Sequence, residues 1–240
     1  MKAVVTGGTG AIGSCLVDEL IASPKWSSVT TIGRKPWLQN TKSVATKTDI
    51  DKKLRHVQLD MEALAASTAK GVDGTAGISP ANVAAAVAAA AAACQGADAA
   101  FCTLGTTHAD AGGGEGFRRV DRWMVEAHVV AASAAKVPYF AHVTSVGGSF
   151  AFLSNYGRTK IHAEEAIRAA AFPASAILQP GLLERGAKMR GAEKIFAAIV
   201  SSTPVSKVAL AMRLDAEAAC GKEGRKGLRE ISDAEIRAIV

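Results

Sequence analysis

A tyrosine and a lysine four residues apart, Tyr156 and Lys160, could together catalyse a proton transfer. The surrounding sequence predicts a helix, on which this spacing places both side chains on one face. A free phenol loses its proton at about pH 10, and a nearby ammonium favours its phenolate, so the pair could act as a general acid or base. Ser145, at the end of the preceding predicted strand, could hydrogen-bond a substrate carbonyl. We expect these three residues to be catalytic; the alternative is a surface pair without chemistry.

A glycine-rich turn near the amino terminus could bind a dinucleotide. Residues 2–6 predict a buried strand, glycines follow at positions 7, 8, 10 and 13, and the apolar spacing of residues 11–22 predicts a helix. Such a turn lets the backbone approach a pyrophosphate, which the free N–H groups at the helix start can hold. The alternative is a glycine-rich turn that binds nothing. The expected cofactor contacts are Gly7, Gly8, Thr9, Gly10, Ala11, Ile12 and Gly13.

The residues that follow the second predicted strand indicate which dinucleotide would bind. In dinucleotide-binding folds, an acid at this place accepts a hydrogen bond from the ribose 2′-hydroxyl of NAD. This chain has Arg34 and Lys35 instead, with no acid before Asp49. A guanidinium cannot accept from a hydroxyl but binds a phosphate well. We therefore expect NADP(H) as the cofactor; the alternative is a solvated Arg34 without any preference.

Further contacts are expected where later strands end. Asp60 ends the third predicted strand, and it could accept from an adenine amino group or cap the next helix; the sequence does not separate these two roles. Leu104, Gly105 and Thr106 follow the fourth strand in a loop of small residues. Because parallel strands end at the same edge of a sheet, we expect this loop to lie beside the cofactor.

The order of the predicted elements indicates an α/β fold with a Rossmann-type, doubly wound parallel sheet. We expect a single NAD(P)-binding domain over residues 1–240, in which about 182–240 form a small lid or extension. Residues 39–53 are expected to form a loop and 70–80 a mobile insertion. The remaining strands are expected at 28–32, 55–60, 98–103, 137–144 and 174–179, and the helices at 82–94, 117–136, 155–171, 192–200, 206–220 and after a capping box at 232–235.

The composition limits the classes of partner. The chain has 240 residues, a formal net charge of +6 and basic residues that are spread along it, so we expect no nucleic-acid partner. The 4 cysteines form no CxxC pair or Cys/His cluster, so we expect neither a metal site nor a disulfide framework. The alanine-rich run at 84–93 is too short and too weakly apolar to cross a bilayer. With an apolar strand that begins almost at Met1 and with reduced thiols, we expect a cytoplasmic protein.

The chain resembles the short-chain dehydrogenase/reductase superfamily in Thr6–Gly13, Asp60, Ser145, Tyr156 and Lys160. It is more narrowly similar to the atypical branch that includes the Tat-interacting-protein oxidoreductases. That similarity covers about residues 1–215, except for the insertion at 70–80, and its stretches are Val29–Lys35, Ala100–Thr107, Gly116–Asp121 and Leu178–Leu183. The resemblance implies a Rossmann fold, NADP(H) binding and Ser-Tyr-Lys chemistry. It also implies that Lys160 holds the nicotinamide ribose and that Pro180 and Gly181 lie near the nicotinamide.

The expected function is an NADP(H)-dependent oxidoreductase of the carbonyl reductase or alcohol dehydrogenase type, acting on a small carbonyl or alcohol. The alternative is a catalytically silent NADPH-binding module that regulates or contacts a protein partner. An epimerase or dehydratase of nucleotide sugars is disfavoured by the short tail. By analogy alone, the helices at 117–136 and 156–171 could pair across a two-fold axis in a homodimer.

Overall fold

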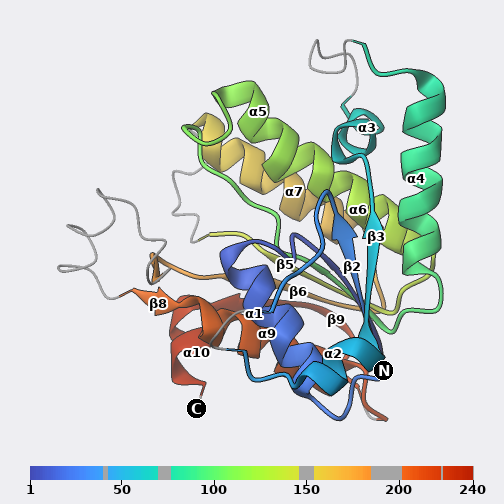
Figure 1. The fold of residues 1–240 in the computed structure, drawn as a ribbon. Helices are drawn as coiled ribbons and strands as arrows, with labels where there is room; N and C mark the ends of the chain where they lie inside the picture. Colours follow the sequence, from blue (N-terminus) through green and yellow to red (C-terminus); the bar gives the residue numbers. More distant parts are fainter. Residues whose placement is uncertain (40–42, 70–76, 146–153, 185–201, 223, 240) are drawn as a thin grey trace.

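Seven parallel strands form one central sheet in the computed structural model, which describes residues 1–39, 43–69, 77–145, 154–184, 202–222 and 224–239 (Figure 1). Their spatial order is β3-β2-β1-β4-β5-β6-β9, so the chain starts at the centre and winds outward in both directions. This order confirms the predicted Rossmann-type sheet. The strands are β1 (Lys2–Thr6), β2 (Ser28–Gly33), β3 (Leu54–Gln58), β4 (Ala99–Cys102), β5 (Tyr139–Val143), β6 (Ala174–Gln179) and β9 (Gly227–Ser232).

Helices cover both faces of the sheet (Figure 1). One face carries α1 (Ala11–Ala22) and α9 (Val205–Ala219), with α2 (Lys47–Lys53) and α10 (Asp233–Ala238) beside them. A separate two-stranded sheet pairs β7 (Leu183–Glu184) with β8 (Thr203–Pro204). The other face carries α3 (Met61–Ala66), α4 (Pro80–Cys94), α5 (Gly114–Arg118), the π-helical turn η2 (Arg119–Trp123), α6 (Met124–Ala134) and α7 (Asn155–Ala170).

The sheet divides the hydrophobic core into two halves. Successive side chains of a strand point to opposite faces, so Val5 and Phe101 pack toward α1 and α9, whereas Val4 and Ala100 pack toward α4 and α6. A parallel sheet with both faces covered needs continuous apolar strands. The central strands have this pattern, which is why the sequence located them; β1, α1 and β6 have the predicted bounds.

Two polar segments differ from the expectation. Residues 47–53, predicted as part of a loop, form α2, which begins where the Thr46 hydroxyl accepts a hydrogen bond from the Asp49 N–H. The helix expected at 117–136 begins earlier, at Gly114, and contains the π-helical turn η2. Neither feature depends on a long apolar stripe, so hydrophobic periodicity did not indicate them.

The carboxyl-terminal region also differs from the expected lid. Within 202–222 and 224–239, α9 packs against α1, and β9 pairs with β6 along the edge of the main sheet. The strand was missed because only Ile231 of its six residues is buried, so it has no apolar run. The capping box at Ser232 and Glu235 is present and begins α10. The expected insertion at 70–80 and helix at 192–200 lie mostly or wholly outside the described residues.

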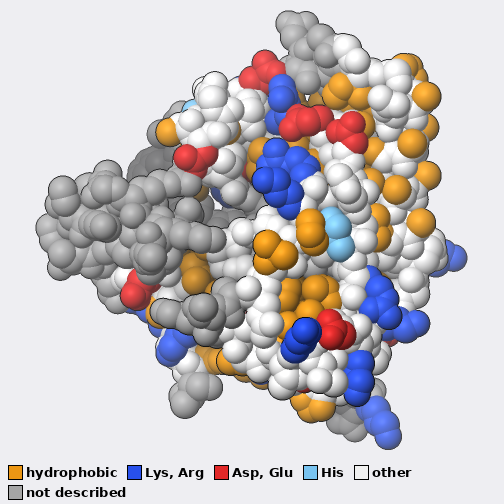
Figure 2. All heavy atoms as spheres, viewed as in Figure 1, with side chains coloured by type: hydrophobic (Ala, Val, Ile, Leu, Met, Phe, Trp, Pro, Cys, Tyr) orange, Lys and Arg blue, Asp and Glu red, His pale blue; other side chains and the backbone are white. Residues whose placement is uncertain are grey.

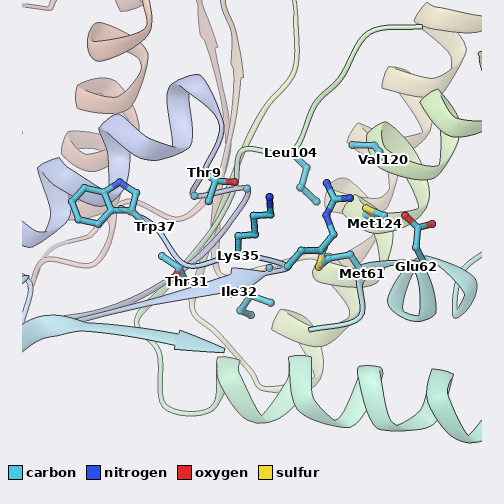
Figure 3. A pocket seen from close by; sticks show the side chains of 14 residues that line it. Thr9, Thr31, Ile32, Lys35, Trp37, Met61, Glu62, Leu104, Val120 and Met124 are labelled. Carbon is cyan, nitrogen blue, oxygen red and sulfur yellow. The ribbon is translucent and has the colours of Figure 1, made fainter. Parts of the chain in front are cut away.

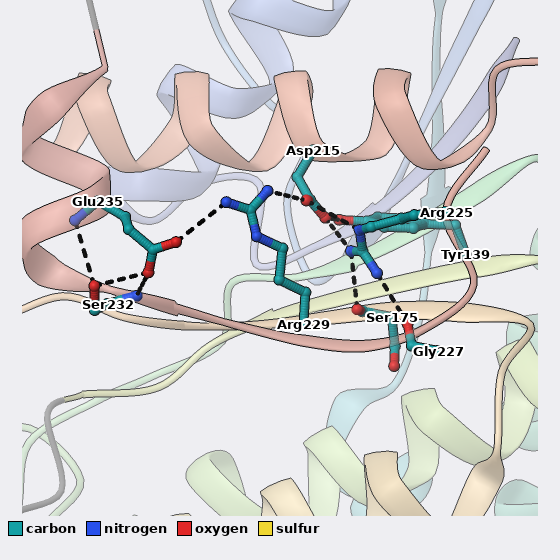
Figure 4. A network of polar contacts seen from close by, with 8 residues as sticks. All are labelled: Tyr139, Ser175, Asp215, Arg225, Gly227, Arg229, Ser232 and Glu235. Carbon is teal, nitrogen blue, oxygen red and sulfur yellow. Dashed lines mark hydrogen bonds and ion pairs between the residues drawn. The ribbon is translucent and has the colours of Figure 1, made fainter. Parts of the chain in front are cut away.

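A buried carboxylate connects α9 to this last strand (Figure 4). Asp215 of α9 accepts hydrogen bonds from the Tyr139 hydroxyl at 2.8 Å and from Arg229 at 3.0 Å, and it also pairs with Arg225. Its side chain is 2% exposed, so these donors replace the water that the carboxylate loses on folding. Arg229 also contacts Glu235 of α10 at 3.2 Å. The network therefore fixes β9 against both helices.

Replacing Asp215 by alanine should lower the free energy of unfolding by about 3 kcal/mol, because two guanidinium groups and a buried phenol lose their acceptor. Glu230→Ala is the matched control. Its pair with Arg168 at 2.5 Å is exposed on both sides, so its loss should cost less than about 1 kcal/mol. Urea denaturation followed by circular dichroism measures both values. Equal losses in the two variants would refute a special role for the Asp215 network.

Candidate functional site

The glycine-rich turn folds back tightly between β1 and α1. Gly7 has a φ of +85°, and its carbonyl accepts a hydrogen bond from the Gly10 N–H at 2.9 Å. A Cβ at Gly13 would lie 2.2 Å from the Gly7 carbonyl oxygen and 2.4 Å from the Thr103 hydroxyl. No side chain caps α1, and its first turn carries no acid. The turn therefore leaves the positive end of α1 open to an anion, which fits the pyrophosphate of a dinucleotide.

A cavity of about 340 Å³ extends from this turn along the end of β2 (Figure 3). Arg34 and Lys35 line it, and the Lys35 side chain rises from the end of β2 toward Thr9 and Leu104. Glu62 also lines the cavity and pairs at 3.2 Å with Arg119, a guanidinium that Glu115 contacts as well, at 2.8 Å. The cavity thus has the two predicted cations where the adenosine end of a dinucleotide would lie.

A second cavity of about 220 Å³ adjoins the first, and Leu104 lines both. It brings together predicted site residues from five separate parts of the sequence. Because parallel strands end at one edge of the sheet, the segments after β1, β4, β5 and β6 meet there with the start of α7. The predicted residues that line it are Gly10, Ala11, Ile12, Leu104, Gly105, Thr106, Ser145, Tyr156, Lys160, Pro180 and Gly181.

The three predicted catalytic residues form a compact group in this second cavity. The Ser145 and Tyr156 hydroxyl oxygens are 3.1 Å apart. The Lys160 ammonium lies 5.9 Å from the centre of the Tyr156 ring, one helical turn away. Helix α7, which carries Tyr156 and Lys160, begins at Asn155 because the Ser154 hydroxyl accepts a hydrogen bond from the Gly157 N–H at 2.9 Å. The group could donate two hydrogen bonds to one substrate oxygen.

Sequence reasoning missed Asp121 as a member of this group. Its Oδ1 accepts from the Lys160 ammonium at 2.6 Å, and its Oδ2 accepts from the Thr106 N–H at 2.8 Å. The Asp121 side chain is fully buried in the turn η2. Asp121 lies in one of the stretches that carry the family resemblance, but nothing in the spacing of the sequence relates it to Lys160.

Two aromatic rings behind the tyrosine were also missed. Phe117 stacks on Tyr156 with ring centres 5.1 Å apart, and His108 stacks on the other face of Phe117 at 4.7 Å. Phe117 is fully buried, whereas Tyr156 is 43% exposed. The stack therefore holds the phenol ring while its hydroxyl end faces the cavity. His108 comes from the glycine-rich segment before α5, which carried no recognisable pattern, and Phe117 lies within α5.

Asp60 caps α3, as one of its two predicted roles requires. Its Oδ1 accepts from the N–H groups of Glu62 and Ala63, both at 3.0 Å. The adenine contact stays a prediction. At the opposite end of the site, the Gly181 N–H donates to Asp233 of α10 at 2.8 Å, which fixes the segment that follows β6.

The buried thiols and histidines do not compete for a catalytic role. Burial raises the pKa of Cys102 to about 12, so its thiol stays protonated and is a poor nucleophile. His128 is buried, and burial lowers its pKa to about 4. Among the described residues, no group of three His, Cys, Asp or Glu side chains could hold a metal ion.

The surface carries mixed charges. Figure 2 shows Lys and Arg side chains distributed among acidic ones over the described part of one face, without a continuous basic patch. No described helix has the length and apolarity needed to cross a bilayer.

Comparison with known proteins gives yeast and mould relatives. The chain is 28% identical over 198 residues to "Protein FMP52, mitochondrial" of Debaryomyces hansenii, covering 82% of this chain and 74% of that protein. It is 30% identical over 185 residues to "Protein fmp52-2, mitochondrial" of Aspergillus terreus, covering 75% of this chain and 66% of that protein. Both relatives are named as mitochondrial proteins, so the expectation of a cytoplasmic protein is wrong.

Solved structures share the fold at low sequence identity. The structure of MoeE5 in complex with UDP-glucose and NAD superposes with a TM-score of 0.64 and 17% identity, covering 97% of this chain and 75% of MoeE5. At this identity the similarity establishes the fold alone. The sequence pattern of the NAD dependent epimerase/dehydratase family matches residues 3–174, which span the glycine-rich turn, Ser145, Tyr156, Lys160 and the five strands β1 to β5 of the sheet. The chain therefore belongs to the NAD dependent epimerase/dehydratase family.

Proposed function

We propose that this protein is an NADP(H)-dependent oxidoreductase of the carbonyl reductase or alcohol dehydrogenase type. The observation that carries the proposal is the 3.1 Å approach of the Ser145 and Tyr156 hydroxyls in a cavity that the glycine-rich turn also lines. The turn would hold the pyrophosphate, Lys160 the nicotinamide ribose, and Pro180 with Gly181 the nicotinamide end. When bound, the cofactor supplies or accepts a hydride.

The chain's own residues would handle the proton and the substrate oxygen. The Tyr156 hydroxyl would donate its proton to a carbonyl oxygen during reduction and take it back during oxidation. The Ser145 hydroxyl would donate a hydrogen bond to the same oxygen and hold the substrate in register. Lys160 would favour the phenolate that forms when Tyr156 has given up its proton. Phe117 would keep the phenol ring in place by stacking.

The preference for NADP(H) rests on the charges of the first cavity. Arg34 and Lys35 both line it, and the one acid on the described wall, Glu62, is already paired with Arg119. A guanidinium and an ammonium together suit the 2′-phosphate of NADP(H).

Two other functions compete with this proposal. A catalytically silent NADPH-binding module would use the same turn, and the narrower resemblance to the Tat-interacting-protein oxidoreductases is compatible with either function. Family membership also brings an epimerase or dehydratase of nucleotide sugars back into consideration.

The names of the two fungal relatives support a mitochondrial location for this chain.

Substituting Gly13 by alanine should weaken NADPH binding at least tenfold and lower the free energy of unfolding by more than about 2 kcal/mol, because the new Cβ collides with the Gly7 carbonyl as well as with the Thr103 hydroxyl. Gly114→Ala is the control, since its Cβ would lie at an ordinary 3.6 Å from its nearest neighbour. Calorimetric titration and thermal unfolding give the two quantities. Unchanged affinity in Gly13→Ala would count against pyrophosphate binding at the turn.

Replacing Arg34 by alanine should raise the Kd for NADPH by about ten- to a hundredfold, the loss expected for hydrogen bonds between a guanidinium and a phosphate. The Kd for NADH should change less than about twofold, because NADH has no 2′-phosphate for Arg34 to bind. Lys52→Ala is the control: it also removes one positive charge, but from an exposed position on α2, and it should leave both dissociation constants unchanged. An equal loss of affinity for NADH and NADPH would exclude recognition of the 2′-phosphate by Arg34.

Tyr156→Phe should slow carbonyl reduction by a factor of about 10² to 10⁴ and leave the Kd for NADPH within about threefold, because the ring still stacks on Phe117 but the proton is lost. The measurement is NADPH consumption with a panel of aldehydes, ketones and quinones. Undiminished turnover by Tyr156→Phe would refute the catalytic role. Tight NADPH binding without turnover of any compound would favour the silent module, and NAD retained through purification would favour the nucleotide-sugar enzymes.

A further inference from the structure

The buried turn η2 brings a carboxylate to the back of the catalytic group. The turn interrupts a regular helical run between α5 and α6, packs against α7, and points Asp121 inward. A fully buried carboxylate is costly unless cations or N–H donors surround it. Single π-helical turns occur often at functional sites, where they redirect one side chain. Asp121 therefore needs partners, and the structure provides two.

Each oxygen of Asp121 contacts a different part of the site. Oδ1 accepts from Lys160, at 2.6 Å, and Oδ2 accepts from the backbone N–H of Thr106, at 2.8 Å. The loop after β4 comes so close that a Cβ at Gly105 would lie 3.7 Å from Oδ1 and 4.0 Å from the Lys160 nitrogen. One side chain thus joins the lysine of the catalytic group to the loop that lines both cavities.

This contact also affects the charge that Tyr156 experiences. The Lys160 side chain is only 11% exposed, and its ammonium lies closer to Asp121 than to the tyrosine ring, whose centre is 5.9 Å away. A carboxylate in direct contact offsets much of the ammonium's field at the phenol. Other charged or titratable groups in this region are His108, which stacks on Phe117, Arg118, which lies with His108 beside Gly114, and Arg158, which follows Tyr156 by two residues on α7 and bonds Asn155.

We propose that Asp121 is a positioning residue that fixes Lys160 to the 104–106 loop and sets how strongly Lys160 favours the Tyr156 phenolate. The inference rests on the proposed function for the role of Tyr156. The contacts of Asp121 with Lys160 and Thr106 do not depend on whether the protein turns over a substrate. The carboxylate holds the ammonium at one place beside the cavity. It also limits the positive charge that Tyr156 experiences.

The test is the phenol-to-phenolate absorbance change of the ligand-free protein. The chain has 2 tyrosines, and burial and the neighbouring Asp215 raise the pKa of Tyr139 well above its ordinary value, so the earlier transition reports Tyr156. Tyr156→Phe, which should lack that transition, verifies the assignment. In Asp121→Asn the midpoint should move to lower pH by about one unit, because the charge of Lys160 is no longer offset.

Matched variants separate this effect from a general loss of charge or of structure. Glu126→Gln removes a carboxylate from α6 that pairs with Arg122 and not with Lys160, so its midpoint should equal that of the wild type. Asp121→Glu keeps the charge and should restore most of the wild-type midpoint. Hydrogen exchange of the 104–107 segment should be faster in Asp121→Asn, because Thr106 loses a charged acceptor.

The outcomes are distinguishable from those of the proposed function. An unchanged midpoint in folded Asp121→Asn, or a shift of the same size in Glu126→Gln, would overturn the role of Asp121 even if carbonyl reduction is observed. If Asp121→Asn does not fold, Asp121→Ser provides the same neutralisation with a smaller side chain. The predicted shift in a protein without turnover would support the role of Asp121 while the reductase proposal fails.

Discussion

The close approach of three backbone segments, the turn after β1, the start of α1 and the end of β4, constrains the rest of the structure. Gly7 and Gly13 leave no space for a side chain. A Cβ at Gly7 would lie 2.8 Å from the Leu104 backbone nitrogen, and a Cβ at Gly13 would lie 2.2 Å from the Gly7 carbonyl oxygen. This contact brings α1 directly onto the sheet and directs its amino terminus toward the cavity. The direction of the α1 amino terminus and the packing of α1 therefore have the same cause.

The parallel sheet brings segments that are far apart in the sequence together at one of its edges. Because β1, β4, β5 and β6 run in the same direction, the segments that follow them lie side by side, and each contributes one part of the site. Tyr156 and Lys160 come from within α7, and their separation of one turn fixes their relative position. The segments that the sheet brings together can lie far apart in the sequence.

The parts predicted from the sequence are those with a local physical signature. Buried strands such as β1 and β6 are apolar runs, and the glycine turn and the Tyr156–Lys160 pair have fixed spacings. Strand β9 and helix α2 have no such signature: one is an exposed edge with only Ile231 buried, and the other contains no buried residue. Asp121 depends on a π-helical turn and a loop meeting in space, which no pattern of spacing encodes.

Two buried carboxylates on opposite faces of the sheet illustrate how one physical requirement serves different ends. Both Asp215 and Asp121 lose their water on folding and need positive charge and N–H or O–H donors in exchange. Asp215 receives them from Arg225, Arg229 and Tyr139, none of which lines the two cavities beside the glycine-rich turn, so the network joins β9 to its neighbouring elements away from the site. Asp121 receives them from Lys160 and Thr106, both of which line the second cavity. Burial of an acid stabilises structure in the first case, and in the second it necessarily alters the field at the neighbouring phenol as well.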